Sequence, residues 1–316
     1  MTIIISKILS IFFITGVGFV ANKVNILPNQ ANRYLVDLLM LITCPCMILI
    51  SIADTELTAE TPSLTLHMLL YSVLFFAASF LLSYLFCIPI LKISREDGAG
   101  VYMACMTTIN NGFMGFPITY ALFGNEILFL MVLFQAVLVT YIYSVGILQV
   151  NYGFQKRGNL LSALKSIANP CTLSAVLGLC LLLTGIRLPQ VLHDALDQLG
   201  SATVPLSMLV VGLQLGNSDI RQCIHNKALV ITSLFKMVFW PLFTFLAVNW
   251  LPLSINVKIA LIFGAAFPAA VAIVPIASME GRDAVLAAES VAFTTLLSII
   301  TLPVTALLLT GYYHLL

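Results

Sequence analysis

The chain has 316 residues, of which 60% are hydrophobic and only 9% are charged, and its formal net charge is +1. Soluble domains average about 25% charged residues, so this composition predicts an all-α polytopic membrane protein and excludes an ordinary soluble fold. A net charge so close to zero also argues against nucleic acid as a partner.

Ten apolar segments of the length needed to cross a bilayer, about 20 residues, follow one another along the chain. A polar stretch from Asn151 to Asn159 separates the fifth from the sixth. We therefore predict two halves, residues 1–150 and 169–316, joined by a cytoplasmic linker at 151–168. The predicted spans are residues 3–21, 32–53, 64–91, 98–123, 127–150, 169–186, 195–216, 228–250, 257–279 and 284–311.

The fourth span is interrupted by residues that disfavour a helix. Asn110 and Asn111 stand side by side in its middle, followed by Gly112 and Pro117. Asn and Gly are weak helix formers, and proline lacks the backbone N–H that a helix needs. The ninth span carries Pro268 in a comparable place. We therefore predict that spans four and nine break near the middle of the bilayer, which is the best sequence indication of a transporter's substrate site.

The helix breakers recur at nearly constant offsets of 161, 160 and 158 positions. Three agreeing offsets indicate a duplication, and chance alignment of prolines is the alternative. Because each half has five spans, an odd number, the second half must enter the membrane from the opposite side. This gives two inverted five-helix repeats. The corresponding pairs are Pro28 with Pro189, Pro45 with Pro205, and Pro117 with Pro275.

The basic residues indicate an orientation for the chain. Loops on one side of the predicted spans hold ten Lys and Arg residues, and loops on the other side hold three. The positive-inside rule therefore places both termini outside the cytoplasm. We expect a multi-pass protein of the plasma membrane, with the bacterial inner membrane as the simplest choice.

Neither a cofactor nor an enzyme activity is predicted. The sequence shows no P-loop, zinc motif or hydrolase elbow. The seven cysteines fall mostly inside apolar spans, which indicates burial rather than a disulfide or metal framework.

If the two predicted breaks cross, half-helix ends meet deep in the membrane. The N-terminus of a helix offers unpaired N–H groups and about half a positive charge, which makes an anion site without a cationic side chain. Asn110 and Asn111 add side-chain amides that can donate to a carboxylate, and Gly112 permits close approach. Hydrogen bonds that only pack the helices are the alternative role for the Asn pair.

Three ionisable residues lie within the predicted spans, namely Asp37, Lys236 and Glu289. Such residues are functional candidates, because a charge in the bilayer is costly. One interpretation is that they snorkel to the interface or that Lys236 and Glu289 form a structural pair. The other is that Glu289 or Asp37 takes up a proton that couples transport.

Several motifs follow one another over nearly the whole chain. Residues 110–124 read Asn-Asn-Gly-Phe-Met-Gly-Phe-Pro-Ile-Thr-Tyr-Ala-Leu-Phe-Gly. The others are Asn169-Pro170, residues 204–216, Lys236 with Pro241, and residues 294–303. In this order and spacing they resemble the auxin efflux carrier family, which includes plant auxin exporters of the PIN type and bacterial malonate and malate permeases.

The resemblance implies ten helices in two inverted repeats, with a scaffold of spans one, two, six and seven. It implies that spans three to five and eight to ten form a transport domain that moves as an elevator. It implies that substrate binds where spans four and nine cross, facing the scaffold. Asn110 matches the family's crossover asparagine, whereas Ala272 stands where the family often has a second amide. This departure favours a substrate with one anionic end and an apolar body. The candidate substrate-binding residues are Asn110, Asn111, Gly112, Pro117, Pro45, Pro205, Pro268 and Ala272.

We therefore predict a secondary active transporter of small organic anions, with carboxylates as the first choice. The alternatives are a sodium-coupled carrier resembling the bile-acid symporters, a non-transporting membrane sensor with a transporter-like body, and a channel. Expected partners are the organic anion, membrane lipids and a second copy bound through the scaffold helices. The motif from Gly212 to Gly216 has the small-residue spacing of either an internal packing face or such a dimer seam.

Overall fold

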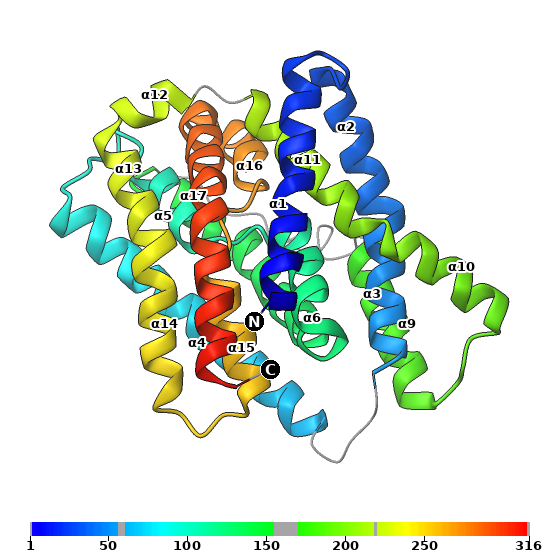
Figure 1. Ribbon diagram of the computed structural model, residues 1–316. Helices are drawn as coiled ribbons and strands as arrows, with labels where there is room; N and C mark the ends of the chain where they lie inside the picture. Colours follow the sequence, from blue (N-terminus) through cyan, green and yellow to red (C-terminus); the bar gives the residue numbers. More distant parts are fainter. Residues whose placement is uncertain (1, 56–60, 155–169, 218–219, 315–316) are drawn as a thin grey trace.

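The computed structural model of the chain describes residues 2–55, 61–154, 170–217 and 220–314. Within these ranges the secondary structure is helical, and no β-strand is present. Figure 1 shows a bundle of tilted helices in which the start of α1 lies near the end of α17. Most of the predicted linker at 151–168 lies outside the described residues.

The first half of the chain alternates long helices with short π-helical turns, labelled η. These elements are α1 (Thr2–Lys23), α2 (Asn29–Leu38), η1 (Leu39–Thr43), α3 (Cys44–Ala53), α4 (Thr61–Leu85), η2 (Phe86–Ile90), α5 (Ala99–Thr107), η3 (Asn111–Gly115), α6 (Phe116–Tyr141), η4 (Ile142–Gly146) and α7 (Ile147–Val150).

The described part of the second half also consists of α-helices, with one π-helical turn. Its elements are α9 (Pro170–Thr184), α10 (Gln190–Ser201), α11 (Thr203–Asn217), α12 (Ile220–His225), α13 (Lys227–Leu234), η5 (Phe235–Phe239), α14 (Trp240–Asn249), α15 (Ile255–Ala265), α16 (Ile273–Met279) and α17 (Ala284–Tyr312).

Every predicted span falls on a helical segment, with ends that differ by a few residues. The longest run, Ala99–Val150, has 52 residues. At 1.5 Å per residue it would be about 78 Å long, far more than one ~30 Å crossing needs. Its backbone leaves the helical region at Gly124, where φ is 77° and ψ is −164°. By length and apolar composition, six runs of the described residues could cross a membrane: 30–53, 61–90, 99–150, 190–216, 227–249 and 284–312.

Prolines explain why several helices contain a π-helical turn. Pro45, Pro117 and Pro241 each follow such a turn, at the second position of the next helix. A proline ring clashes with the carbonyl four residues before it and offers that carbonyl no N–H. The wider π turn accommodates this mismatch without ending the helix. Pairs of consecutive elements such as η1 and α3 therefore continue as one bent rod.

Two closely packed helix pairs form one side of the molecule. Figure 1 shows α1 beside α11 and α3 beside α9, and both pairs are in contact. Glycines permit the close approach, because a Cβ on Gly212 would collide with the backbone of Thr15 and Phe19 in α1. The row from Gly212 to Gly216 is thus a packing face within one chain, so a dimer seam through this row is excluded. A homodimer through other parts of these helices stays a prediction.

Replacing Gly212 with Ala should lower the stability of the folded protein. The added methyl group has no free space at the α1–α11 contact, and overpacking of this kind costs about 1–3 kcal/mol. The measurement is the thermal unfolding midpoint of the protein purified in detergent. Gly16→Ala is the matched control, because a Cβ at Gly16 on α1 would meet nothing within 4 Å. Equal midpoints for the two variants would contradict the packing that the structure shows.

Candidate functional site

Two helices are interrupted where the sequence predicts a break. In the fourth span, α5 ends at Thr107, Thr108 is extended (φ −89°, ψ 154°), and helical backbone resumes at Asn111. In the ninth span, α15 ends at Ala265 and α16 begins at Ile273. The residues at both breaks are largely buried. Each break therefore exposes backbone N–H and carbonyl groups inside the protein rather than to lipid.

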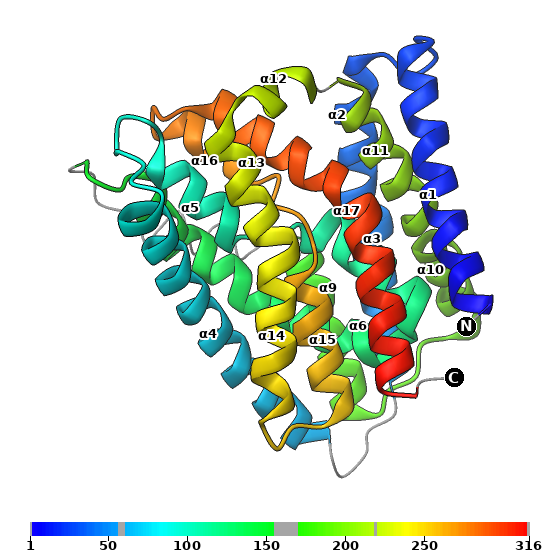
Figure 2. The same cartoon turned by 60° about the vertical axis from the view of Figure 1, so that its left-hand side comes forward.

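The two breaks are joined directly. The backbone N–H of Asn110 donates a hydrogen bond of 2.8 Å to the carbonyl oxygen of Pro268. Figure 2 shows the connection between α15 and α16 running through the middle of the bundle. Two of the predicted site residues, 158 positions apart in the sequence, thus meet at one point. We call this point the crossing, defined by residues 108–112 and 266–272.

Lys236 holds the first half of the interrupted fourth span. Its side chain is buried, with 1% of its surface exposed. Its Nζ donates to the carbonyl oxygens of Met106, at 3.1 Å, and Thr108, at 2.7 Å. The last carbonyls of a helix have no partner within the helix and carry partial negative charge, so an ammonium group there is stabilising.

The predicted pair between Lys236 and Glu289 does not form. Within the described part of the chain, the hydrogen bonds of the Lys236 ammonium go to the two backbone carbonyls at the end of α5. Glu289 is half-buried on α17, and Asp37 is exposed on α2. The sequence identified Lys236 as unusual but gave no indication that its partners are main-chain atoms.

Thr294 holds the break in the ninth span. Its Oγ1 accepts a hydrogen bond of 3.2 Å from the backbone N–H of Ala269 and donates one of 2.7 Å to the carbonyl of Ser290 on its own helix. A residue of α17 thus supports one break, while Lys236 of η5 supports the other. Sequence reasoning assigned Thr294 no role, because one hydroxyl in an apolar span is not distinctive.

The adjacent amides Asn110 and Asn111 have different surroundings. The Asn111 Nδ2 donates to the carbonyl of Met131 in α6 at 3.1 Å. Its Oδ1 is packed against Gly115, where a Cβ would collide with it. The Asn110 side chain makes no hydrogen bond with any described residue, although only 3% of the residue is exposed. Asn111 therefore has the packing role that was the alternative for the pair, and Asn110 keeps its amide available.

The positive end of the second half-helix begins at the crossing. Gly112 and Phe113 lie in the first turn of η3, where a helix has no carbonyl to accept their N–H groups. Both residues are half-buried rather than fully enclosed. A Cβ on Gly112 would lie 3.5 Å from the Cε of Met40 in η1. The N-terminus of the half-helix therefore lies beside η1 at this glycine.

The remaining predicted site residues are spread around the crossing. Pro117 is buried in the first turn of α6, and Pro45 is buried in the first turn of α3. Pro205 is exposed on α11, a helix that packs on η3 and α6. Ala272 is half-buried, directly before α16. The helices that carry Pro45 and Pro205 thus pack against the interrupted segment.

Comparison with known proteins identifies the family. The profile of a family described as "Membrane transport protein" matches residues 3–306. The chain belongs to this family. It is the auxin efflux carrier-like family that the motifs resemble. An uncharacterized transporter of Methanocaldococcus jannaschii is 24% identical over 307 residues, which cover 93% of this chain and 95% of that protein. The molecule is therefore a multi-pass membrane transporter.

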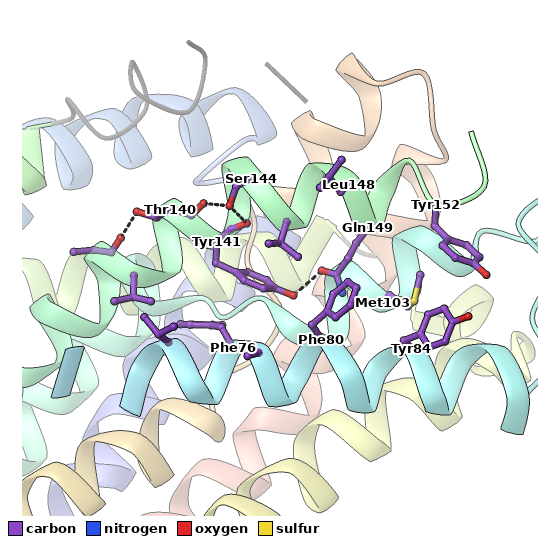
Figure 3. Close-up of a pocket in the computed structure, with 15 residues that line it drawn as sticks. Phe76, Phe80, Tyr84, Met103, Thr140, Tyr141, Ser144, Leu148, Gln149 and Tyr152 are labelled. Carbon is purple, nitrogen blue, oxygen red and sulfur yellow. Dashed lines mark hydrogen bonds between the residues drawn. The ribbon is translucent and has the colours of Figure 1, made fainter. Parts of the chain in front are cut away.

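Two large grooves of this transporter lie away from the crossing, on the surface of the helices. One, of about 860 Å³, lies between α4 and the end of α6 with α7 (Figure 3). Its polar end is Gln149, whose Oε1 accepts hydrogen bonds of 2.9 Å from both Tyr141 and Thr107. The other, of about 590 Å³, is apolar and lies between α14 and α17.

A third cavity of the transporter, of about 940 Å³, is polar. It lies where the ends of α3 and α9 meet the start of α10. The Nε2 of His193 lies 3.1 Å from an oxygen of Asp54 there, and Arg187 and Asp194 also line the cavity. Sequence reasoning found neither this cluster nor Gln149, because each depends on helices that are far apart in the chain.

Proposed function

We propose that this transporter is a secondary carrier of small organic anions, with carboxylates as the first choice, and that the substrate binds at the crossing beside Asn110. The observation that carries the proposal is the 2.8 Å hydrogen bond between the Asn110 N–H and the Pro268 carbonyl. It brings together two interrupted helices, and carriers with such helices hold their substrates between them.

The charge at the crossing favours an anion. The first-turn N–H groups of Gly112 and Phe113 form the positive end of the η3–α6 half-helix. The ammonium group of Lys236 lies 2.7 Å from the carbonyl of Thr108, four residues before Gly112. The small pocket around Lys236 is lined by Tyr102, Cys105, Met106, Thr232, Ser233, Ser290 and Thr294, none of which is acidic.

The apolar side of the crossing supports the narrower substrate class. Residues 266–272 contain no amide or charged side chain, and Ala269 and Ala270 are buried there. A carboxylate on the η3 side would therefore find hydrocarbon on the other side. This arrangement suits a molecule with one anionic end and an apolar body better than a dicarboxylate.

Replacing Asn110 with Asp tests the sign of the ligand's charge. The two side chains have nearly the same shape, but a carboxylate at this position repels an anion and should weaken its binding roughly tenfold or more. The measurement is a thermal-shift screen of purified protein against monocarboxylates and dicarboxylates.

The matched control is Asn256→Asp, at a half-buried asparagine of α15 whose amide donates to Glu126. This variant should respond to the same carboxylates as the unmodified protein. A carboxylate that stabilises Asn110→Asp as strongly as the unmodified protein would move the binding site elsewhere. Stronger binding of a cation by Asn110→Asp would replace the anion carrier with a cation carrier.

We propose that the ten helical segments are two inverted five-helix repeats, residues 1–150 and 169–316. The packing supports this arrangement, because α1 of the first span contacts α11 of the seventh while α9 of the sixth contacts α3 of the second. A two-fold axis between the repeats would exchange span one with span six and span two with span seven. It would therefore carry the α1–α11 pair onto the α9–α3 pair. We propose that both termini lie outside the cytoplasm. We also propose that the chain lies in a plasma membrane, with a bacterial inner membrane as our first choice.

We propose further that the helices move in two groups, as an elevator. The glycine-packed α1–α11 and α3–α9 pairs are the scaffold. The other group is tied together by aromatic rings of α4, α6 and α14, with Phe75 centred 5.4 Å from Phe134 and 5.1 Å from Trp240. At the boundary, Gly112 meets the flexible side chain of Met40, a contact without hydrogen bonds that can slide.

Cross-linking of the two groups should stop transport. The pair is Met40→Cys with Gly112→Cys, in a background without the seven native cysteines, joined by a short thiol-reactive linker. Uptake into proteoliposomes should be lost with the linker and return when a cleavable linker is cut. The control is Glu126→Cys with Asn256→Cys, a pair within the mobile group whose side chains lie 3.0 Å apart. Equal uptake by both linked proteins would contradict the elevator.

We propose that Glu289 carries the proton that couples transport. It is half-buried on α17, next to Ser290, which lines the Lys236 pocket, whereas Asp37 is exposed on α2. Uptake by the unmodified protein should depend on pH, and Glu289→Gln should remove this dependence because the amide of glutamine does not titrate. Asp37→Asn is the control and should keep it. An unchanged pH profile in Glu289→Gln would exclude this role.

A further inference from the structure

The ammonium group of Lys236 occupies a position with the chemistry of a cation site. In carriers with interrupted helices, the freed carbonyls at the C-terminal end of a half-helix coordinate the coupling cation. Here the corresponding carbonyls are those of Met106 and Thr108, at the end of α5. The Lys236 Nζ lies 3.1 Å and 2.7 Å from their oxygens, both within hydrogen-bonding distance, and the shorter has the length of a charge-assisted bond.

The surroundings of Lys236 leave little room for another ion. The pocket around its side chain has a volume of about 10 Å³, roughly the least that holds a single water molecule. Cys105, Ser233 and Ser290 are among the residues that line it, and no carboxylate does so. A sodium site would need several oxygen ligands around an open centre. At this place the lysine itself fills the centre.

The local backbone holds Lys236 in this position. It lies in η5, the π turn that precedes Pro241, and π turns inside helices are frequent at functional sites. The exposed fraction of its side chain is too small for the ammonium group to reach water directly. Because a buried charge in such a place is costly, its presence indicates a function at this depth.

We propose that Lys236 is a tethered cation that stands in place of a coupling sodium ion, so that the crossing is assembled without Na⁺. The proposal rests on the proposed function in one respect, that the crossing is the transport site. It separates this carrier from the sodium-coupled alternative. The test of the Lys236 proposal uses no substrate. Its failure would therefore leave the anion-site proposal intact, and failure of the anion-site proposal would leave the Lys236 proposal intact.

The first measurement is the thermal unfolding midpoint of the full-length protein in NaCl, KCl and choline chloride at equal ionic strength. The unmodified protein should give the same midpoint in all three salts. A midpoint several degrees higher in NaCl than in both other salts would show a specific sodium site and overturn the proposal.

The second measurement restores the cation chemically. Lys236→Ala removes three methylene groups and the ammonium group, which n-propylammonium reproduces. This variant should unfold several degrees below the unmodified protein, and n-propylammonium chloride should recover part of the difference. Tetramethylammonium, which carries the charge without an N–H donor, should recover none. Lys236→Met fills the space with an apolar chain and should stay unstable with either salt.

Two further variants keep the test decisive. Lys227→Ala, at an exposed lysine of α13, should keep the midpoint of the unmodified protein and respond to neither amine. If Lys236→Ala does not fold, Lys236→Arg is measured in its place. This variant keeps a charged donor, so its unfolding midpoint should be the same in sodium as in the other salts. Failure of n-propylammonium to stabilise a folded Lys236→Ala, or equal stability of Lys236→Ala and the unmodified protein, would overturn the proposal.

Discussion

A single backbone hydrogen bond, from the N–H of Asn110 to the carbonyl of Pro268, joins the two interrupted helices of this transporter. Breaking a helix inside a bilayer frees polar groups, and each one left unpaired there costs several kcal/mol. Two breaks that meet can satisfy each other in part. Lys236 donates to the carbonyl of Thr108, and Thr294 accepts from the N–H of Ala269, so further backbone groups freed by the breaks are also hydrogen-bonded. The irregular backbone is thus stable because helices from both halves of the chain complete it.

Neighbouring residues of the interrupted fourth span have different contacts and different roles. Asn111 fixes the geometry by bonding to the carbonyl of Met131, and Gly115 makes room for its side chain. Asn110 is thereby left with a side chain that has no partner in the described part of the chain. The half-helix N-terminus at Gly112 lies beside the side chain of Met40 in η1. A packed asparagine, an available amide and the start of a half-helix thus lie within a few residues of one another.

The sequence was sufficient for features that depend on local chemistry. Asn, Gly and Pro clustered in an apolar span disfavour a continuous helix, so the interruptions before Asn111 and Ile273 could be predicted. The partners of Lys236 could not be predicted, because a buried lysine suggests a carboxylate and here it bonds to carbonyls 130 and 128 positions away. The hydrogen bonds of Gln149 could not be predicted either, because one of its partners, Thr107, lies on a different helix.

Membership of the membrane transport protein family agrees with this picture, while the substrate follows only from the chemistry of the crossing. The most direct test is to locate a bound carboxylate. We predict that anomalous scattering from a brominated monocarboxylate, soaked into crystals of the transporter, places its carboxylate within hydrogen-bonding distance of Asn110 or of the N–H groups at Gly112 and Phe113. A bromine position in the groove beside Tyr141, with the crossing empty, would contradict the account.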